Sequence, residues 1–249
     1  MIDLTKVENR AIAERVREEG RELMSKAHFG VQGIAKTEND VKAALSRLQK
    51  TGFKPMAFDT EMNFVPIVRN IVGDTYNLHC AVSYPLGRMT LKKKMQDLET
   101  LLKMDIKDVC VCLDWQAIFS HRYKDVEKEA RAIVKEFDGL FTKNAYVIPA
   151  TLLSDTEMKD TLSALDEAGV YSVKVNPGCK LGVSFEEVAL IKRLYPNRFD
   201  IHPSGNIRTL EAFEKFMELG CQVIHTASAL DIVEAYMERQ LKIYGGIEE

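Results

Sequence analysis

The sequence has little of what marks several classes of protein. No apolar run approaches the length that crosses a bilayer, and the first residues lack the apolar core of a signal peptide. The formal net charge is −3, and the only tight basic run, Lys92-Lys93-Lys94, lies in a helical pattern. Without a basic surface, neither nucleic acid nor a membrane is an expected partner. These absences predict a cytoplasmic protein.

Cysteine is also scarce. The five cysteines are odd in number and fall in or at the ends of expected strands, which favours reduced core thiols over a disulfide framework: Cys80, Cys110, Cys112, Cys179 and Cys221. Cys110 and Cys112 share one face of a strand, but two thiolates do not make a metal site and no histidine-rich motif lies near them. The sequence therefore predicts no metal and no cofactor.

What is present is a regular alternation of strand and helix patterns. Apolar residues make up 46% of the 249 residues and charged residues 29%, which is ordinary for a globular protein, and no stretch looks like a linker. Eight strands are expected over residues 29–35, 53–58, 76–84, 107–113, 145–150, 170–175, 199–202 and 222–226. The helices that follow them are expected over 41–50, 64–72, 90–104, 125–137, 154–168, 185–194, 210–219 and 230–241.

This alternation predicts the fold class. Strands that alternate with helices form parallel βαβ units, and eight of them in one chain indicate an α/β protein with a (β/α)8 TIM barrel. We expect a single barrel domain over residues 1–249, with an extra N-terminal helix within residues 1–28 that caps one end. A doubly wound open sheet is the alternative, but no Gly-x-Gly-x-x-Gly follows the first strand. In a barrel, reactive residues lie at the carboxyl ends of the strands.

One expected strand, 170–175, carries Lys174. A lysine is rarely buried unless it has a countercharge or a chemical role. Burial disfavours a charged amine, and a neutral amine can attack a carbonyl group to form a Schiff base. Alternatively, Lys174 reaches solvent from the end of its strand.

Two further residues are expected near the mouth of the barrel. Alternation places Cys110, Cys112 and Asp114 on one face of their strand, and Asp200 and His202 on one face of theirs. Lysine, histidine and carboxylate together can supply a nucleophile and proton-transfer groups. Taken singly, His202 fits a core histidine, and Asp114 fits a helix cap or an ion-pair partner.

Two loops favour an anion. Residues 204–209 form a glycine-containing loop that opens a helix, and residues 226–229 do the same after the last strand. Free N–H groups and the helix dipole attract negative charge at such positions. The loops after strands seven and eight are the usual phosphate site of (β/α)8 barrels.

Four segments resemble the deoxyribose-phosphate aldolase family of class I aldolases: Tyr84-Pro85-Leu86-Gly87, the stretch from Tyr171 to Gly178, residues 202–209 and residues 226–229. The resemblance implies that Lys174 is the Schiff-base lysine and that the substrate is a small phosphorylated carbonyl compound of carbohydrate metabolism. It further implies a phosphate site made of Gly178, Gly205, Asn206, Ile207, Arg208 and Ser228. A homo-oligomer is possible.

The sequence departs from the family at three positions. The family's second active-site lysine falls on His202, its proton-relay aspartate on Cys110, and one phosphate-loop glycine on Asn206. Asp114 then becomes a candidate for the proton relay. We therefore expect an aldolase-like lyase that keeps the Schiff base but acts on a different substrate. The alternatives are a non-catalytic protein that binds sugar phosphates, and other lysine-dependent aldol or acyl-transfer chemistry on the same barrel.

Overall fold

Eight parallel strands form the centre of the molecule. The computed structural model describes residues 2–245. Its strands are β1 (Ala27–Gly30), β2 (Ala57–Thr60), β3 (Leu78–Val82), β4 (Asp108–Cys112), β5 (Lys143–Ile148), β6 (Ser172–Val175), β7 (Asp200–Pro203) and β8 (Ile224–His225). They are paired in the order β7-β6-β5-β4-β3-β2-β1-β8, and a parallel bridge from Ser204 to His225 joins the two outer strands. The sheet is therefore a nearly closed barrel, which confirms the expected fold.

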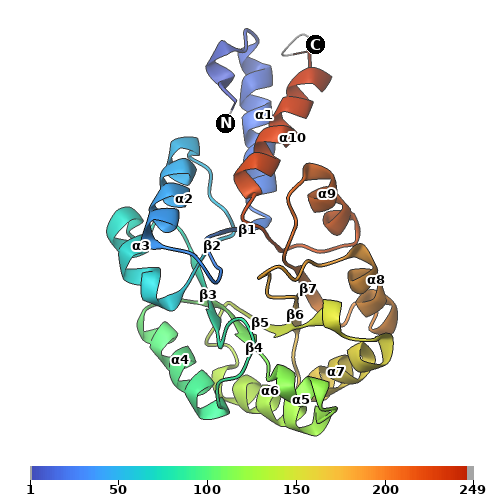
Figure 1. Cartoon of the computed structure of the whole chain (residues 1–249). Coiled ribbons are helices and arrows are strands. Elements are labelled where there is room, and N and C mark those ends of the chain that lie inside the picture. The colour runs from blue at the N-terminus through green and yellow to red at the C-terminus, as the bar shows by residue number, and fades with distance from the viewer. Residues whose placement is uncertain (1, 246–249) are drawn as a thin grey trace.

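A ring of helices surrounds the strands (Figure 1). Its members are α2 (Glu38–Thr51), α3 (Val65–Val72), α4 (Leu91–Lys103), α6 (Tyr123–Phe137), α7 (Asp155–Glu167), α8 (Phe185–Leu194), α9 (Leu210–Glu218) and α10 (Ala229–Ile243). Single 3₁₀ turns occur at Leu4–Lys6, Met62–Phe64 and Ala150–Leu152. None of the helices in the described part of the chain is long and apolar enough to cross a membrane.

The connection after β4 contains a short helix, α5 (Trp115–Phe119), that the sequence pattern does not indicate. Five residues are too few to display a helical period. Helix α5 begins where Asp114 caps it, because the Asp114 side chain accepts a hydrogen bond from the backbone N–H of Gln116. This cap determines where the Asp114 carboxylate points.

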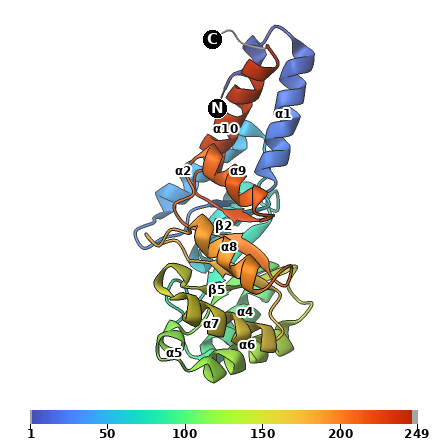
Figure 2. The same ribbon diagram turned by 90° about the vertical axis from the view of Figure 1, so that its right-hand side faces the viewer.

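The N-terminal helix α1 (Arg10–Met24) packs along α10. The expectation that it caps one end of the barrel was wrong, because α1 and α10 project together from the side of the barrel in both views (Figures 1 and 2). Gly20 allows the close approach, since a Cβ atom there would lie 2.8 Å from the sulfur of Met237. The apolar stripe of α1 is thus buried against a helix rather than against the barrel end.

The first two strands begin and end at other residues than expected. The apolar stretch that begins at Phe53 suggested a strand from that residue, but β2 starts at Ala57. Phe53 is buried although it belongs to the loop before the strand. Gly30 ends β1 where the chain passes over β2, because a Cβ atom there would lie 2.0 Å from the carbonyl oxygen of Asp59. Apolar side chains in the loop before β2 resemble a strand pattern, which explains why the expected strand began four residues before the observed one.

The barrel interior differs from one half to the other. Beside β3, β4 and β5 one group of interior side chains is apolar or bears a thiol, and most of its members are small: Ala81, Tyr84, Cys110, Cys112, Ala145 and Val147. Around β1, β2 and β8 it holds buried imidazole and carboxylate groups, including His28, Asp59 and His225. Lys174 enters this interior from β6.

Candidate active site

Lys174 lies inside the barrel at the carboxyl half of β6. It pairs in register with Val147 of β5 and His202 of β7, and only 1% of its surface is exposed. Its Nζ atom lies 3.9 Å from the Sγ atom of Cys110. Among residues 2–245 no carboxylate forms an ion pair with it. The lysine is thus buried without the carboxylate partner that a structural lysine needs.

A cavity of about 360 Å³ opens above Lys174 at the carboxyl ends of the strands. Besides Lys174, its walls include all six residues expected to bind phosphate: Gly178, Gly205, Asn206, Ile207, Arg208 and Ser228. The structure therefore brings the lysine and both anion-binding loops to one cavity. Whether these residues bind phosphate stays a prediction.

The loop after β6 is held by Asn176. This buried residue has a left-handed backbone, with φ of 66°, which asparagine tolerates better than most side chains do. Its amide nitrogen donates hydrogen bonds to Thr151 Oγ1 at 2.8 Å and to Glu187 Oε2 at 3.3 Å, and its amide oxygen accepts from the N–H of Thr151 at 3.1 Å. These bonds fix the loop that brings Gly178 to the cavity wall.

The loop after β7 depends on a glycine. Gly205 has a φ of 89°, and a Cβ atom there would lie 2.2 Å from the carbonyl oxygen of Leu181. No other residue fits without moving the neighbouring backbone. The loops after β7 and β8 are tied together because Thr226 Oγ1 donates to the carbonyl of Ile207 at 2.6 Å and accepts from the N–H of Ser228 at 2.9 Å. Helix α10 then begins at Ala229 without a side-chain cap, and free N–H groups at a helix start favour an anion.

Basic side chains dominate the charged part of the cavity wall. Lys36, Lys174, Lys180 and Arg208 face one carboxylate, that of Asp59. Burial raises the pKa of Asp59, but the neighbouring histidines His225, His79 and His28 outweigh burial and hold this pKa well below its usual range. The cavity thus carries a net positive charge that suits an anionic ligand.

Cys110 lies beside Lys174 beneath the cavity and is buried. Burial raises the pKa of its thiol, but the positive charges of Lys174 and His79 outweigh burial and lower the pKa below the usual value. The thiol therefore ionises more readily than a buried cysteine in apolar surroundings does. This is the strongest link between a sequence-selected proton-transfer residue and the lysine.

His202 neighbours Lys174 on β7 but does not line the cavity. Its Nε2 atom lies 2.8 Å from Oδ2 of Asp200, toward the amino end of the barrel. Burial lowers the pKa of His202, and the hydrogen bond to Asp200 only partly opposes this. The neutral imidazole then donates its Nε2 proton to Asp200.

Asp114 is not brought to the cavity. Its carboxylate caps α5, and Oδ2 lies 3.9 Å from Nη2 of Arg122. Its backbone N–H is held by Oε2 of Glu129 at 2.9 Å, and Oε1 of Glu129 pairs with the buried Lys94 at 2.5 Å. The expectation that Asp114 meets Lys174 was therefore wrong, since strand β4 ends at Cys112 and alternation no longer governs the face of Asp114.

Sequence reasoning missed three groups of residues near the site. Asp59 and His225 line the cavity, and Lys36 and Lys180 add charge to it. His28 and His79 lie in the barrel interior. A histidine or aspartate within an expected buried strand is the signal that would have found the interior residues, by the same reasoning that selected Lys174.

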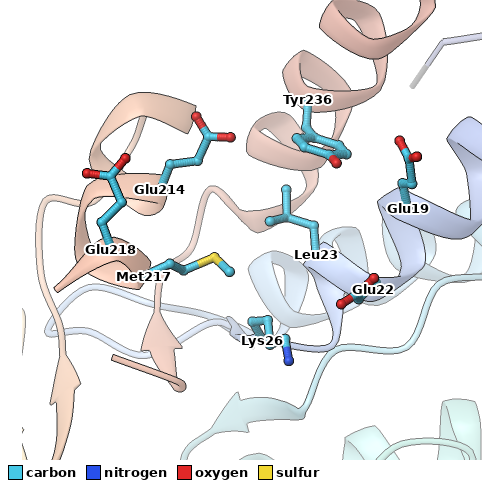
Figure 3. A pocket seen from close by; sticks show the side chains of 8 residues that line it. All are labelled: Glu19, Glu22, Leu23, Lys26, Glu214, Met217, Glu218 and Tyr236. Carbon is cyan, nitrogen blue, oxygen red and sulfur yellow. The ribbon is translucent and has the colours of Figure 1, made fainter. Parts of the chain in front are cut away.

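Another cavity, of about 440 Å³, lies between α1, α9 and α10 (Figure 3). Four glutamates line it together with Lys26, Leu23, Met217 and Tyr236: Glu19, Glu22, Glu214 and Glu218. It lies away from the carboxyl ends of the strands and is acidic. Its lysine, Lys26, is only partly buried, and the cavity therefore lacks the buried lysine and the positive charge of the cavity above Lys174.

The sequence is similar to curated deoxyribose-phosphate aldolases. That of Caldanaerobacter subterraneus is 26% identical over 208 residues, covering 82% of this chain and 89% of the relative. That of Dictyoglomus turgidum is 24% identical over 196 residues, covering 78% and 88%. That of Aquifex aeolicus is 27% identical over 163 residues, covering 65% and 74%. No family model matches the sequence.

Solved structures show the same fold. The structure described as QR15, an aldolase, is 21% identical with a TM-score of 0.76 and covers 89% of this chain and 99% of its own. The tetrameric deoxyribose phosphate aldolase of Aeropyrum pernix is 20% identical with a TM-score of 0.75 and covers 90% and 97%. The molecule therefore has the (β/α)8 barrel of these aldolases, with a buried strand-end lysine under a basic cavity. The sequence is thus similar to curated deoxyribose-phosphate aldolases at about 25% identity, and the fold is that of solved aldolase structures.

Proposed function

We propose that the protein is a class I aldolase that forms a Schiff base between Lys174 and a phosphorylated sugar or aldehyde. The observation that carries the proposal is the position of Lys174. Its amine is buried at the end of β6, lacks a carboxylate partner within the described residues, and faces a cavity with basic walls. Related sequences are named deoxyribose-phosphate aldolase, which supports carbon–carbon bond chemistry.

The reaction follows from the chemistry of an amine. The neutral Nζ atom attacks the carbonyl carbon, and loss of water from the adduct gives an iminium ion. When the hydroxyl group two carbons away loses its proton, the intervening carbon–carbon bond breaks and its electrons flow into the iminium. An aldehyde leaves and an enamine remains on Lys174. Protonation of the enamine carbon and addition of water then release the second product and restore the lysine.

Proton transfer requires a group close to Nζ. We assign it to Cys110, whose sulfur lies 3.9 Å away and whose pKa is lowered by Lys174 and His79 in spite of burial. His202 lies on the neighbouring strand and donates its Nε2 proton to Asp200. Its Nδ1 atom is then unprotonated and can accept a proton. We leave Asp114 out of the reaction, because its carboxylate caps α5.

The phosphate of the substrate would sit between the loops after β6, β7 and β8. Gly178, Gly205 and Asn206 bring their backbone close to the cavity, and Arg208 supplies a positive charge. Ser228 lies at the start of α10, where helix N–H groups favour an anion. Ile207 is buried and also lines the cavity. The phosphate would thereby hold the carbonyl group against Lys174.

Borohydride trapping tests this proposal. The wild-type protein is incubated with deoxyribose 5-phosphate, other phosphorylated aldehydes and small unphosphorylated aldehydes, then reduced and mapped by peptide mass. We expect an adduct on Lys174, and we expect Lys174→Met to lower turnover roughly 10⁴-fold or more. Lys180→Met is the matched control, because Lys180 lines the same cavity but is exposed. The control should still trap substrate.

The same experiment separates the alternatives. An adduct on another lysine, or full turnover in Lys174→Met, contradicts the proposal. A phosphorylated ligand that raises the melting temperature while no carbonyl compound forms an adduct would indicate a non-catalytic binding protein. An adduct without carbon–carbon cleavage would indicate other lysine-dependent chemistry.

A further inference from the structure

The interior of the barrel holds a cluster of imidazole and carboxylate groups that the proposed reaction does not use. We call it the histidine cluster. It consists of His28 on β1, Asp59 on β2, His79 on β3, Asp108 on β4 and His225 on β8, and all five residues are buried. Three of the chain's five histidines therefore meet in one place. Buried polar groups are costly, so such a concentration requires an explanation.

Each imidazole of the cluster is oriented by a carboxylate. His28 Nδ1 lies 3.0 Å from Asp59 Oδ1, His225 Nδ1 lies 3.0 Å from Asp59 Oδ2, and His79 Nδ1 lies 2.7 Å from Asp108 Oδ1. These contacts place a ring proton on Nδ1, so Nε2 is the ring atom that can bind a metal ion, with release of any proton that it carries. Metal-binding histidines are oriented by carboxylates in the same way.

The Nε2 atoms of the three histidines form no hydrogen bond with a carboxylate. Those of His28, His79 and His225 are all buried, and none forms a hydrogen bond within the described part of the chain. His28 Nε2 does lie within ion-pair distance of Asp108 Oδ2, at 3.4 Å, and the His79 side chain also interacts with the thiol of Cys110. Three buried imidazoles whose Nε2 atoms form no hydrogen bond of normal geometry suggest a bound species between them.

The rings are close enough to share a single ion. One ligand atom from each of His28, His79, His225 and Asp59 can be chosen so that all four lie within 4.8 Å of one another. The ring centroids of the three histidines are 4.2, 4.9 and 5.1 Å apart. Zinc–nitrogen bonds of about 2.0–2.1 Å would require the rings to move closer together than they are in this structure.

We propose that the histidine cluster binds one divalent transition-metal ion of the zinc type through the imidazoles of His28, His79 and His225, with Asp59 and Asp108 orienting the rings. Imidazole nitrogen suits Zn²⁺ and its neighbours, whereas Mg²⁺ and Ca²⁺ prefer oxygen ligands. Two buried carboxylates also balance the charge of one divalent cation without any proton on the three rings.

The ion would have an open coordination position on the side of the cavity. Asp59 and His225 line the cavity above Lys174, so an ion reaches the cluster through the same opening. Three histidine ligands and one exchangeable position are the arrangement of a catalytic rather than a closed structural zinc site. The site does not depend on the proposed aldolase reaction.

The sequence analysis gave no sign of this site because its ligands come from distant strands. His28, His79 and His225 share no short spacing, and the expectation of no metal rested on the pair Cys110 and Cys112. Only the closure of the barrel, which sets β8 beside β1, pairs His28 with His225 in register. The absence of a linear motif therefore says little about metal binding here.

Metal analysis of the whole protein, purified without a histidine tag, tests the proposal. After incubation with Zn²⁺ and dialysis, we expect about one equivalent of tightly held zinc per chain. His79→Gln and His225→Gln should lose it while circular dichroism stays unchanged. His121→Gln is the matched control, because His121 is exposed and pairs with Glu157 outside the barrel. It should keep the zinc.

Two further measurements test the proposal even if the histidine variants fail to fold. Asp108→Asn keeps the size of the side chain and should weaken zinc affinity about 10- to 100-fold. The visible spectrum of Co²⁺ bound to the wild-type protein should show nitrogen and oxygen ligands. A thiolate-to-cobalt band would instead place the ion on Cys80 or Cys110 and overturn the ligand set.

The result that overturns the proposal outright is wild-type protein that retains no zinc and no cobalt. The histidine cluster would then be a hydrogen-bonded network whose positive charge comes from protons. Because every readout is a metal content or a spectrum, this failure is distinct from a failure of the Schiff-base reaction.

Discussion

The pair formed by Lys174 and Cys110 is the residue-level basis of the proposed chemistry. The resemblance to deoxyribose-phosphate aldolases placed the family's proton relay on Cys110, where a thiol replaces a carboxylate. The structure places this thiol 3.9 Å from the amine and surrounds it with positive charge. A cysteine in such surroundings is a better proton acceptor than its burial alone would allow.

We predict that Cys110→Ala separates Schiff-base formation from turnover. Borohydride should still trap substrate on Lys174, because the amine is unchanged. Turnover should fall about 10²- to 10⁴-fold, the usual contribution of a positioned proton-transfer group. Single-turnover kinetics and trapping, carried out on the same preparation, provide the two readouts.

Cys112→Ala serves as the control for this variant. Cys112 is buried two residues further along β4, in the same apolar half of the interior, and burial raises the pKa of its thiol well above the usual value. The Cys112→Ala variant should therefore turn over substrate at nearly the wild-type rate. Equal turnover in wild type and Cys110→Ala would remove Cys110 from the reaction and leave His202 as the candidate.

The sequence located some site residues and missed others for identifiable reasons. Lys174 and the two anion-binding loops could be found because each lies in a short continuous segment with its own chemical signal. Asp114 was misplaced because strand alternation was extended beyond the end of β4 into the cap of α5. Asp59 and His225 could not be placed at the cavity without knowing how the barrel closes.

At the level of elements, most helix starts were expected to within two residues, although α2 begins at Glu38 rather than at residue 41. Thr37, Ser154 and Ser184 each cap a helix through a reciprocal capping box. Such boxes are local and follow from residues three positions apart, so a sequence reveals them. The start of β1 and β2 depends on which backbone atoms find partners in the barrel, and apolar loop residues conceal it.

The capping box of α7 gives a prediction about pH. Hydrogen bonds from the Ser154 side chain and backbone, with a further contact to His121, lower the pKa of Glu157 from 4.5 to about 2. A carboxyl group with a lowered pKa stabilises the folded state above its unfolded pKa and loses this effect as pH falls toward its folded pKa. The contribution should therefore be complete above about pH 4.5 and disappear toward pH 2.

Thermal unfolding of Glu157→Gln tests this. At about pH 6 the variant should melt about 2 °C below wild type, and the difference should shrink toward zero near pH 2. Asp155→Asn removes a carboxylate from the same turn that takes no part in the box, so it should keep the acid dependence of Glu157. A constant difference between wild type and Glu157→Gln at every pH would show that the charge of Glu157 does not strengthen the cap.

At the level of the whole molecule, the fold was predicted more completely than the arrangement of its ends. Eight βα units favour a closed barrel over an open parallel sheet, and the barrel is what the structure shows. The place of α1 could not be predicted, because its apolar stripe fits a barrel end or a neighbouring helix equally well. A homo-oligomer stays a prediction, although one solved relative is described as tetrameric.

Charge is distributed unevenly over the molecule. The chain has a formal net charge of −3, yet Lys36, Lys174, Lys180 and Arg208 meet at the candidate site, while four glutamates line the cavity beside α1. A basic cavity on an acidic molecule focuses its field at the opening and attracts anions there. Ions in solution screen such a field within a Debye length.

We therefore predict that anion binding at this cavity depends on salt. The affinity for inorganic phosphate, measured by calorimetry, should fall about 3- to 10-fold between about 0.01 and 0.1 M sodium chloride, because the Debye length shrinks from about 30 to about 10 Å. Arg208→Met should bind phosphate more weakly and with a flatter salt dependence, since it removes a positive charge from the cavity wall. Binding of an unphosphorylated aldehyde should not respond to salt. If phosphate affinity is the same at both salt concentrations and in Arg208→Met, the basic wall does not bind the anion, and the phosphate of any substrate must lie elsewhere.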